Sequence, residues 1–341
     1  MTPDVHLRRE GRVGRVTVSR PEALNALTHD MVIRIDAALV AWAQDDDVAL
    51  VVIEGASDRA FCAGGDLPSM YEVGRSGDTG AALQFWRDEY RLDRRLARYP
   101  KPVVSFLHGI TMGGGVGLGC HASHRVVDDT SRIAMPECAV GLIPDVGGSL
   151  LLARAPGRLG VFLGLTGHRM GPGDAILCGF ADHYVPDAWD ELKAELIASG
   201  DCACVREATA PPPEARLEPL VGAFDGVFEA DELRYVDFDE VPDLDGALRR
   251  ALASHAPLSL CATYAVQHRL DPTSTIEDAL EMEWRFCARA FSHGDFLEGI
   301  RAMIVDKDRR PRWRHADVGA VTPVEIDAVL APVDAAPLSW S

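Results

Sequence analysis

The 341-residue sequence has no apolar run near the ~20 residues that are needed to span a bilayer. Its first stretch, MTPDVHLRREGRVGRVTVSR, also lacks the apolar core of a secretory signal peptide. The composition, 47% hydrophobic and 25% charged, is ordinary for a globular protein. These features argue against a membrane partner and predict a cytoplasmic protein.

The sequence also lacks a CxxC pair, although it contains eight cysteines. Scattered single cysteines predict reduced, mostly buried thiols rather than a disulfide framework. Zinc-binding residue types occur in Cys202-Ala203-Cys204 and Cys120-His121, but no second pair stands at ligand spacing. We therefore expect no metal site. The cysteines are Cys62, Cys120, Cys138, Cys178, Cys202, Cys204, Cys261 and Cys287.

Positive charge is scarce: the formal net charge is −18, and the only lysines are Lys101, Lys193 and Lys307. This balance argues against nucleic acid and anionic membranes as partners. An anionic ligand would need a local basic segment, and DRRPRWRH, residues 308–315, is one. The segment is either a solvated C-terminal face or a phosphate-binding site.

The chain is long enough for one large α/β domain with an appendage. A paired strand start (VHLRRE, VGRVTVSR), a helix from Thr28, and buried strands at ALVVIEG and KPVVSFLHG give strand–helix alternation to about residue 186. A Pro-rich, non-periodic stretch follows, and then helical patterns. We predict a core over residues 1–196, a divergent excursion over 197–240 and a helical C-terminal region over 241–341.

The stretch AMPECAVGLIPDVGG contains two carboxylates, Glu137 and Asp145, and no other charge. A carboxylate among apolar neighbours loses hydration, and its pKa rises toward the range that is useful for proton transfer. Alternatively, Glu137 caps a strand end and Asp145 caps the next helix. Two glycine-rich loops, FCAGGDL and ITMGGGVGLG, are either tight strand–helix turns or backbone donors that converge on one oxygen.

Taken together and in order, SRPEALNALTHDM, FCAGGDL, KPVVSFLHGITMGGGVGLG and MPECAVGLIPDVGG resemble the crotonase (enoyl-CoA hydratase/isomerase) superfamily. LGLTGHRM and FSHGDFLEGIRAMIVDKDRRPRWRH extend the resemblance to its subgroup of 3-hydroxyisobutyryl-CoA hydrolases. The resemblance covers nearly the whole chain and is weakest at about residues 197–240. It implies an α/β fold, a spiral of ββα units, with a helical C-terminal extension.

The resemblance also assigns roles to residues. The oxyanion-hole donors would be the N–H groups of Gly65 and Gly114, and the CoA-binding residues would be Ala23, Ala26, Ala63, Asp66 and Lys307. The catalytic pair would be Glu137 and Asp145. We expect Glu137 to attack the thioester or deprotonate a water, and Asp145 to bind the 3-hydroxyl or assist the leaving thiolate. No cofactor is expected beyond the CoA of the substrate.

The superfamily's hydratases carry a second glutamate, which falls on Gly117 here, so hydration would lack one of its two acid–base groups. The expected activity is hydrolysis of 3-hydroxyisobutyryl-CoA in valine catabolism, by a possible homo-oligomer. An enoyl-CoA hydratase/isomerase and a non-catalytic acyl-CoA-binding protein are the alternatives.

Overall fold

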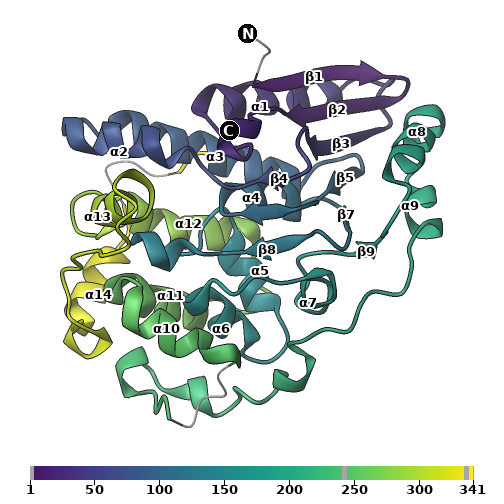
Figure 1. The fold of residues 1–341 in the computed structure, drawn as a ribbon. Helices are drawn as coiled ribbons and strands as arrows, with labels where there is room; N and C mark the ends of the chain where they lie inside the picture. Colours follow the sequence, from purple (N-terminus) through teal and green to yellow (C-terminus); the bar gives the residue numbers. More distant parts are fainter. Residues whose placement is uncertain (1–3, 240–243, 334–337, 341) are drawn as a thin grey trace. The chain divides into compact units, whose positions relative to one another are not determined.

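A computed structural model describes residues 4–239, 244–333 and 338–340. The chain folds into two compact units, each assembled from separate segments (Figure 1). The first unit consists of Met1–Gly65, Arg91–Ala134 and Arg169–Arg216. The second consists of Asp66–Tyr90, Met135–His168 and Leu217–Ser341.

The first unit is built on a six-stranded sheet whose strand order is β1-β2-β3-β5-β7-β9. Only β1 and β2 pair antiparallel, and the other neighbours are parallel. As a parallel sheet requires, its central strands are apolar runs that are buried on both faces. The strands are β1 Val5–Glu10, β2 Val13–Val18, β3 Leu50–Gly55, β5 Val103–Phe106, β7 His124–Val127 and β9 His183–Tyr184.

A second, three-stranded parallel sheet joins β4 Ala60–Cys62, β6 Ile110–Met112 and β8 Arg132–Ala134. In each successive pair, β3/β4, β5/β6 and β7/β8, the first strand enters the large sheet and the second enters the small one. This repeat confirms the predicted α/β fold of ββα units. The glycine loop was expected to begin at residue 110, but residues 110–112 form β6 and helix α4, Gly114–Cys120, begins within the glycines.

Helices of the first unit cover the large sheet. Helix α1, His29–Ala43, begins at Thr28, whose side chain accepts the N–H of Met31, as the sequence predicts. Helices α8, Trp189–Ser199, and α9, Ala203–Glu207, contribute Leu192, Leu196 and Val205 to a core with the side chains of β2, β3, β5 and β7. A further short helix, α7, spans Pro172–Leu177.

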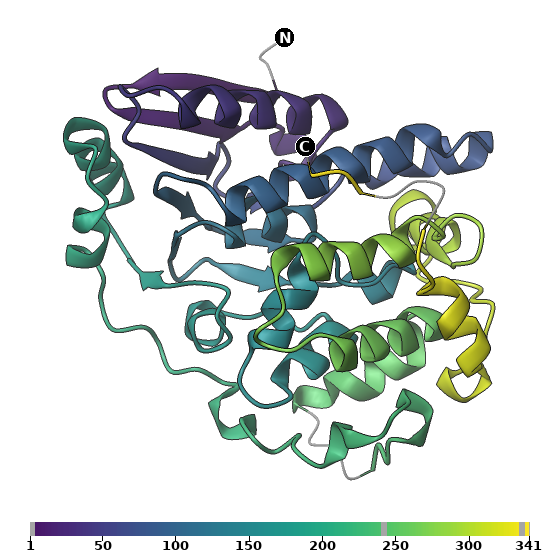
Figure 2. The ribbon, with the colours of Figure 1, turned by 180° about the vertical axis from the view of Figure 1, so that it is seen from behind.

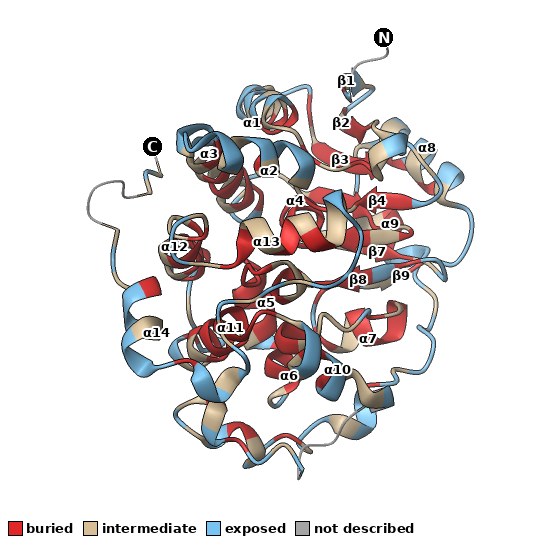
Figure 3. Cartoon of the chain, turned by 60° about the vertical axis from the view of Figure 1, so that its left-hand side comes forward, coloured by how far each residue is buried: buried red, intermediate tan, exposed pale blue. Residues whose placement is uncertain are grey.

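The second unit is helical in its described residues. Helix α11 is its centre: most of its side chains are buried, and it packs against α5, α6, α12 and α14 (Figures 1 and 3). Seen from behind, α11 and α12 lie next to each other (Figure 2). The helices are α2 Leu67–Ser76, α3 Gly80–Ala97 (its last residues belong to the first unit), α5 Gly148–Arg154, α6 Leu159–Thr166, α10 Ala247–Ser254, α11 Pro257–Arg269, α12 Ile276–Cys287, α13 Phe296–Ile300 and α14 Pro323–Val329.

The C-terminal region is helical as expected, and residues 208–239 contain short 3₁₀ turns and one isolated bridge, from Ala210 to Tyr184. The predicted division into 1–196, 197–240 and 241–341 stays a prediction, and its boundary at 240/241 lies outside the described residues. All eight cysteines are free, and all except Cys202 are buried, as predicted. In the described residues, every helix is too short or too polar to cross a membrane.

Candidate active site

Two loops of the first unit lie against each other and contain most of the residues expected to contact CoA. Ala23 ends a 3₁₀ turn, Pro21–Ala23, and Ala26 follows it. The N–H of Ala63 donates to the carbonyl of Leu24 at 3.0 Å, in the loop between those two alanines. The N–H of Leu27 donates to the carbonyl of Gly64 at 2.8 Å, so backbone hydrogen bonds join the loop after Ala23 to the loop after β4.

The first loop is held by Asn25, which the sequence analysis did not single out. Leu24 and Asn25 have φ values of +51° and +59°, a conformation that Asn tolerates better than most residues. The buried Asn25 amide donates to the carbonyl of Ala60 at 2.8 Å and accepts the N–H of Arg20 at 2.9 Å. The only sequence signal for this role is an asparagine inside an otherwise apolar turn.

The two glycine loops approach each other within the first unit. Gly64 has φ +113°, and a Cβ there would lie 3.2 Å from the carbonyl oxygen of Met112 and 3.6 Å from the nitrogen of Gly114. A Cβ on Gly115 would lie 2.1 Å from the carbonyl oxygen of Cys62, so α4 reaches the small sheet only with glycine there. In the described chain, the N–H groups of Gly65 and Gly114 donate to no protein acceptor.

Glu137 lies in the second unit, at the start of a 3₁₀ turn, Glu137–Val140. Its side chain is 6% exposed, and its Oε2 atom has no hydrogen-bond partner in the described residues. Burial, followed by the nearby charge of Asp145, raises the pKa of Glu137 well above its ordinary value. A buried, unpartnered carboxyl whose pKa is raised in this way is a candidate for proton transfer.

Asp145 also lies in the second unit, but it does not cap the next helix, because α5 begins at Gly148 with Gly147 as its N-cap. The Tyr90 hydroxyl donates to Asp145 Oδ2 at 3.0 Å. The Cys287 thiol lies 3.8 Å from the same oxygen. Burial raises the pKa of Asp145 to about 7, although the hydrogen bond from Tyr90 opposes this rise.

The backbone after Asp145 is strained and clamped. Val146, a β-branched residue, has φ +55°, a conformation that costs energy and often occurs at functional sites. The buried carboxylate of Glu283 accepts the N–H of Gly147 at 2.8 Å and the N–H of Ser149 at 3.1 Å. Glu283 therefore fixes the turn that carries Asp145, and burial raises its own pKa to about 8.

Another buried carboxyl belongs to the same group. Glu89, next to Tyr90 on α3, is 3% exposed, and its Oε1 atom has no partner in the described residues. Burial and then the charge of Asp145 raise the pKa of Glu89 well above its ordinary value. Buried carboxyls that interact do not all ionise together, so Glu89 and Asp145 influence each other's ionisation.

The remaining predicted residues border these loops or lie on the surface. Asp66 is the N-cap of α2 and accepts the N–H of Ser69 at 3.3 Å. Lys307 is exposed and has φ +56°; it follows Asp306, the C-cap of a π-helical turn, Arg301–Val305. We define the basic patch as the exposed residues Lys307, Arg309, Arg310 and Arg312, whose side chains form no ion pair with the described residues.

Arg314 differs from the basic patch, although the sequence groups it with the same arginines. Its guanidinium donates to the carbonyls of His293 and Ser292, at 2.9 and 3.2 Å, so it holds the backbone together. Within the described residues, histidine, cysteine and acidic side chains nowhere form a group of three or more that could hold a metal ion.

Comparison with known proteins places the chain in a family. Residues 13–330 match the enoyl-CoA hydratase/isomerase family. A curated relative from Gallus gallus, "3-hydroxyisobutyryl-CoA hydrolase, mitochondrial", is 35% identical over 97% of this chain and 89% of its own length. A solved structure described as an enoyl-CoA hydratase from Rhodobacter sphaeroides 2.4.1 is 52% identical, with a TM-score of 0.94 over 99% of this chain and 100% of that one.

A second solved structure, described as a carnitinyl-CoA dehydratase from Mycobacterium thermoresistibile, is 40% identical, with a TM-score of 0.93 over 99% of both chains. The relatives thus share the fold over almost the full length but carry names of different activities. The chain belongs to the enoyl-CoA hydratase/isomerase family, among the relatives of the 3-hydroxyisobutyryl-CoA hydrolases.

Proposed function

We propose that the protein is an acyl-CoA thioester hydrolase that converts 3-hydroxyisobutyryl-CoA to 3-hydroxyisobutyrate and CoA, a step of valine catabolism. The observation that carries this proposal is the buried Glu137 carboxyl, whose Oε2 atom has no hydrogen-bond partner in the part of the chain that the structure describes. Burying such a group without a partner is costly, so a stability role does not account for it. The name and 35% identity of the Gallus gallus relative support the substrate.

In this proposal Glu137 is the base or nucleophile. As a base it takes a proton from water while the water oxygen attacks the thioester carbonyl; as a nucleophile it forms an anhydride that water then cleaves. Either route passes through a tetrahedral oxyanion, and the free N–H groups of Gly65 and Gly114 are assigned to it. Collapse breaks the carbon–sulfur bond, and the CoA thiolate leaves with the electron pair and then takes a proton.

Asp145 is assigned to the 3-hydroxyl of the acyl group, as an acceptor. Its Oδ2 atom already accepts from Tyr90, which favours the ionised carboxylate over a proton donor. The loops of Ala23, Ala26 and Ala63, together with Asp66, are assigned to the CoA moiety, and Lys307 with the rest of the basic patch to its phosphates. We propose that turnover needs no added cofactor. The cytoplasmic location and the homo-oligomer stay predictions.

The second candidate function is hydration of an enoyl-CoA, and the name of the 52% identical Rhodobacter structure favours it. Addition of water to a double bond needs one group to activate water and another to protonate the α-carbon. Gly117, in α4, has no side chain for either task. Asp145 would have to supply the second group, which conflicts with its role as an acceptor.

The deciding experiment compares two substrates on purified protein. Hydrolysis of 3-hydroxyisobutyryl-CoA is followed with a chromogenic thiol reagent, and hydration of crotonyl-CoA by the loss of its conjugated absorbance. We expect thiol release without added metal or nucleotide and no meaningful hydration. Robust hydration without thiol release would overturn the hydrolase proposal and favour the hydratase. Binding of acyl-CoA with neither reaction would indicate a non-catalytic binding protein.

A further inference from the structure

Tyr90 is a buried residue of the second unit that the proposed mechanism has not yet used. Resting on the proposed function, we propose that Tyr90 is a positioning residue: its hydroxyl occupies Oδ2 of Asp145 and leaves Oδ1 to accept the 3-hydroxyl of the substrate. Tyr90 thereby contributes to the preference for 3-hydroxylated acyl groups without touching the substrate. The geometry of three buried side chains carries this inference.

Tyr90, Asp145 and Cys287 form a closed triangle. The Tyr90 hydroxyl lies 3.0 Å from Asp145 Oδ2 and 3.2 Å from the sulfur of Cys287, and that sulfur lies 3.8 Å from the same Oδ2. Tyr90 and Cys287 are fully buried, and Asp145 is 4% exposed. The Trp284 ring packs edge-on to the Tyr90 ring, with centroids 6.4 Å apart, and so restricts the direction of the hydroxyl.

The number of hydrogens on each group decides which one donates and which one accepts in this triangle. The phenol and the thiol carry one hydrogen each, and an ionised carboxylate carries none. The carboxylate is the strongest acceptor of the three, so the phenol donates to Asp145 at 3.0 Å, and the thiol points to the same oxygen over a longer, weaker contact of 3.8 Å. Both side-chain contacts of Asp145 end on Oδ2. A backbone N–H also acts on the Asp145 carboxyl. We assign the oxygen that has no side-chain contact among the described residues, Oδ1, to the ligand hydroxyl.

The groups around Asp145 make its ionisation depend on the hydrogen bond from Tyr90. The titratable groups that face it are Tyr90 and Glu89 from α3, Glu283 and Cys287 from α12, and Glu137 from the 3₁₀ turn. Each of these groups is neutral or negative, and Asp145 forms no ion pair with the residues that the structure describes. The hydrogen bond from Tyr90 lowers the pKa of Asp145 against the effect of burial. Removing it should disfavour the carboxylate and loosen its orientation.

The backbone of Asp145 is fixed separately. Glu283 holds the amides of Gly147 and Ser149, as described above, and does not contact the Asp145 carboxylate through a hydrogen bond in the described chain. Substituting Tyr90 therefore changes the side chain of Asp145 and leaves the clamp on its turn in place. This separation makes a selective test possible.

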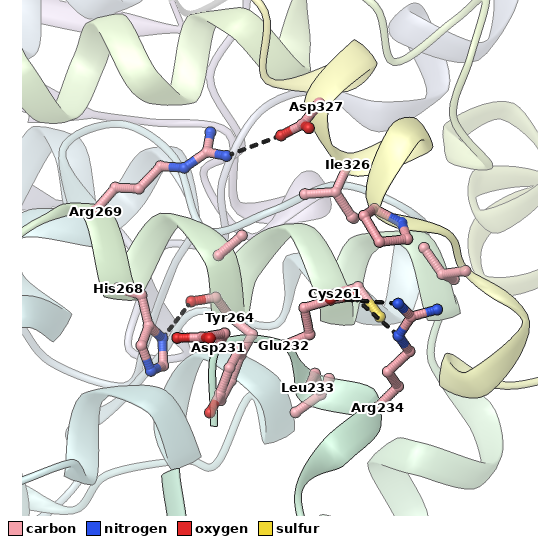
Figure 4. A pocket seen from close by; sticks show the side chains of 13 residues that line it. Asp231, Glu232, Leu233, Arg234, Cys261, Tyr264, His268, Arg269, Ile326 and Asp327 are labelled. Atoms are coloured by element: carbon pink, nitrogen blue, oxygen red, sulfur yellow. Dashed lines mark hydrogen bonds and ion pairs between the residues drawn. The ribbon is translucent and has the colours of Figure 1, made fainter. Parts of the chain in front are cut away.

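The test is Tyr90→Phe, with Tyr264→Phe as the matched control. Tyr264 on α11 is also a fully buried tyrosine of the second unit, and its hydroxyl donates to the carbonyl of Ala230 at 2.7 Å. It lines a cavity of about 230 Å³ that contains none of the predicted site residues (Figure 4). A further control, Cys287→Ala, removes the thiol but leaves the hydrogen bond from Tyr90 to Asp145.

Activity is measured on 3-hydroxyisobutyryl-CoA and on isobutyryl-CoA, which lacks the hydroxyl. Loss of a hydrogen bond to a charged group predicts a fall in kcat/KM of roughly 10- to 100-fold for the hydroxylated substrate in Tyr90→Phe. For isobutyryl-CoA we expect kcat/KM of Tyr90→Phe to fall less than about threefold. The two control variants should also lose less than about threefold in kcat/KM, on both substrates. The acid limb of the pH profile should move to higher pH in Tyr90→Phe, because Asp145 then ionises at higher pH.

The ionisation of Asp145 is followed independently by ¹³C NMR of labelled protein, using the carboxyl resonance that disappears in Asp145→Asn. We expect its titration to move to higher pH in Tyr90→Phe but not in Tyr264→Phe. An unmoved titration, an equal loss on both substrates, or an equal loss in Cys287→Ala would overturn the role of Tyr90. If wild-type protein releases no CoA, the proposed function falls, while the titration still decides whether Tyr90 sets the ionisation of Asp145.

Discussion

Asp145→Asn should make the protein more stable at neutral and alkaline pH, although it removes a residue of the proposed site. Burial raises the pKa of Asp145 from 3.8 to about 7, so the folded protein keeps a proton that the unfolded chain releases. At about 1.4 kcal/mol for each pKa unit, this corresponds to on the order of 4 kcal/mol. Asparagine has no proton to release, and its oxygen still accepts from Tyr90.

The sign of this pH dependence follows from the linkage between proton binding and folding. Because the folded-state pKa is raised, the stability that Asp145 contributes is fully present below pH ~4 and is lost as pH rises through ~7. Glu283, with its pKa raised to about 8, adds a loss of the same sign over a slightly higher range. Asp145→Asn removes the loss of stability that comes from Asp145. The free energy of unfolding of the variant should therefore exceed that of wild type by a margin that grows from pH 5 to pH 8.

The assay is urea unfolding followed by tryptophan fluorescence at pH 5, 6, 7 and 8, for wild type and variant in the same buffers. Asp46→Asn, at an exposed position of the first unit, is the control and should follow wild type at every pH. A stability difference for Asp145→Asn that does not change with pH would refute the reasoning, and so would one that turns against the variant as pH rises.

Two further predictions follow from the proposed roles. Glu137→Gln should lower kcat by about 10²- to 10⁴-fold while the affinity for a CoA ester stays nearly unchanged, as measured by thiol release and by calorimetry; activity within a few-fold of wild type would remove Glu137 from the mechanism. Replacing Arg309, Arg310 and Arg312 by alanine should raise KM and flatten its dependence on ionic strength with little change in kcat. Arg12→Ala, on the surface of the first unit, controls for the loss of a surface arginine; an unchanged KM in the triple variant would make the basic patch a solvated face.

The sequence predicted those parts of the fold whose signals are local. The run at β3 is apolar because the strand is buried on both faces, and Thr28 has the side chain that caps α1. The small sheet was missed in part, because β4, β6 and β8 are only three residues long and show no period. Ile110–Met112 becomes a strand only by pairing with neighbours that are distant in the sequence.

The site could be predicted only as far as its motifs extend along the chain. The glycine loops and the carboxylates lie in short, ordered stretches, so a sequence comparison detects them. Tyr90 and Cys287 contact Asp145 across 55 and 142 residues, and each lies on a helix where an apolar core side chain would fit the same pattern. A buried hydroxyl or thiol that serves a carboxylate therefore looks in the sequence like an ordinary core position.

Two buried glutamates in the same chain show why burial alone does not identify a catalytic carboxyl. Glu54, in the first unit, is 4% exposed and lies 2.6 Å from the Nε of Arg15 and 3.0 Å from the Nζ of Lys193. These cations and their hydrogen bonds outweigh burial and lower the pKa of Glu54 to about 2, so it stays ionised and joins neighbouring elements. Glu137 is similarly buried, but the charged groups that act on it are the carboxyls of Asp145 and Glu283, and burial together with these charges raises its pKa. Two cations beside Glu54 make that carboxylate part of an ion-paired network that stabilises the fold. Glu137 forms no ion pair with the described residues and lies near other acids, so its carboxyl is left to accept and release a proton.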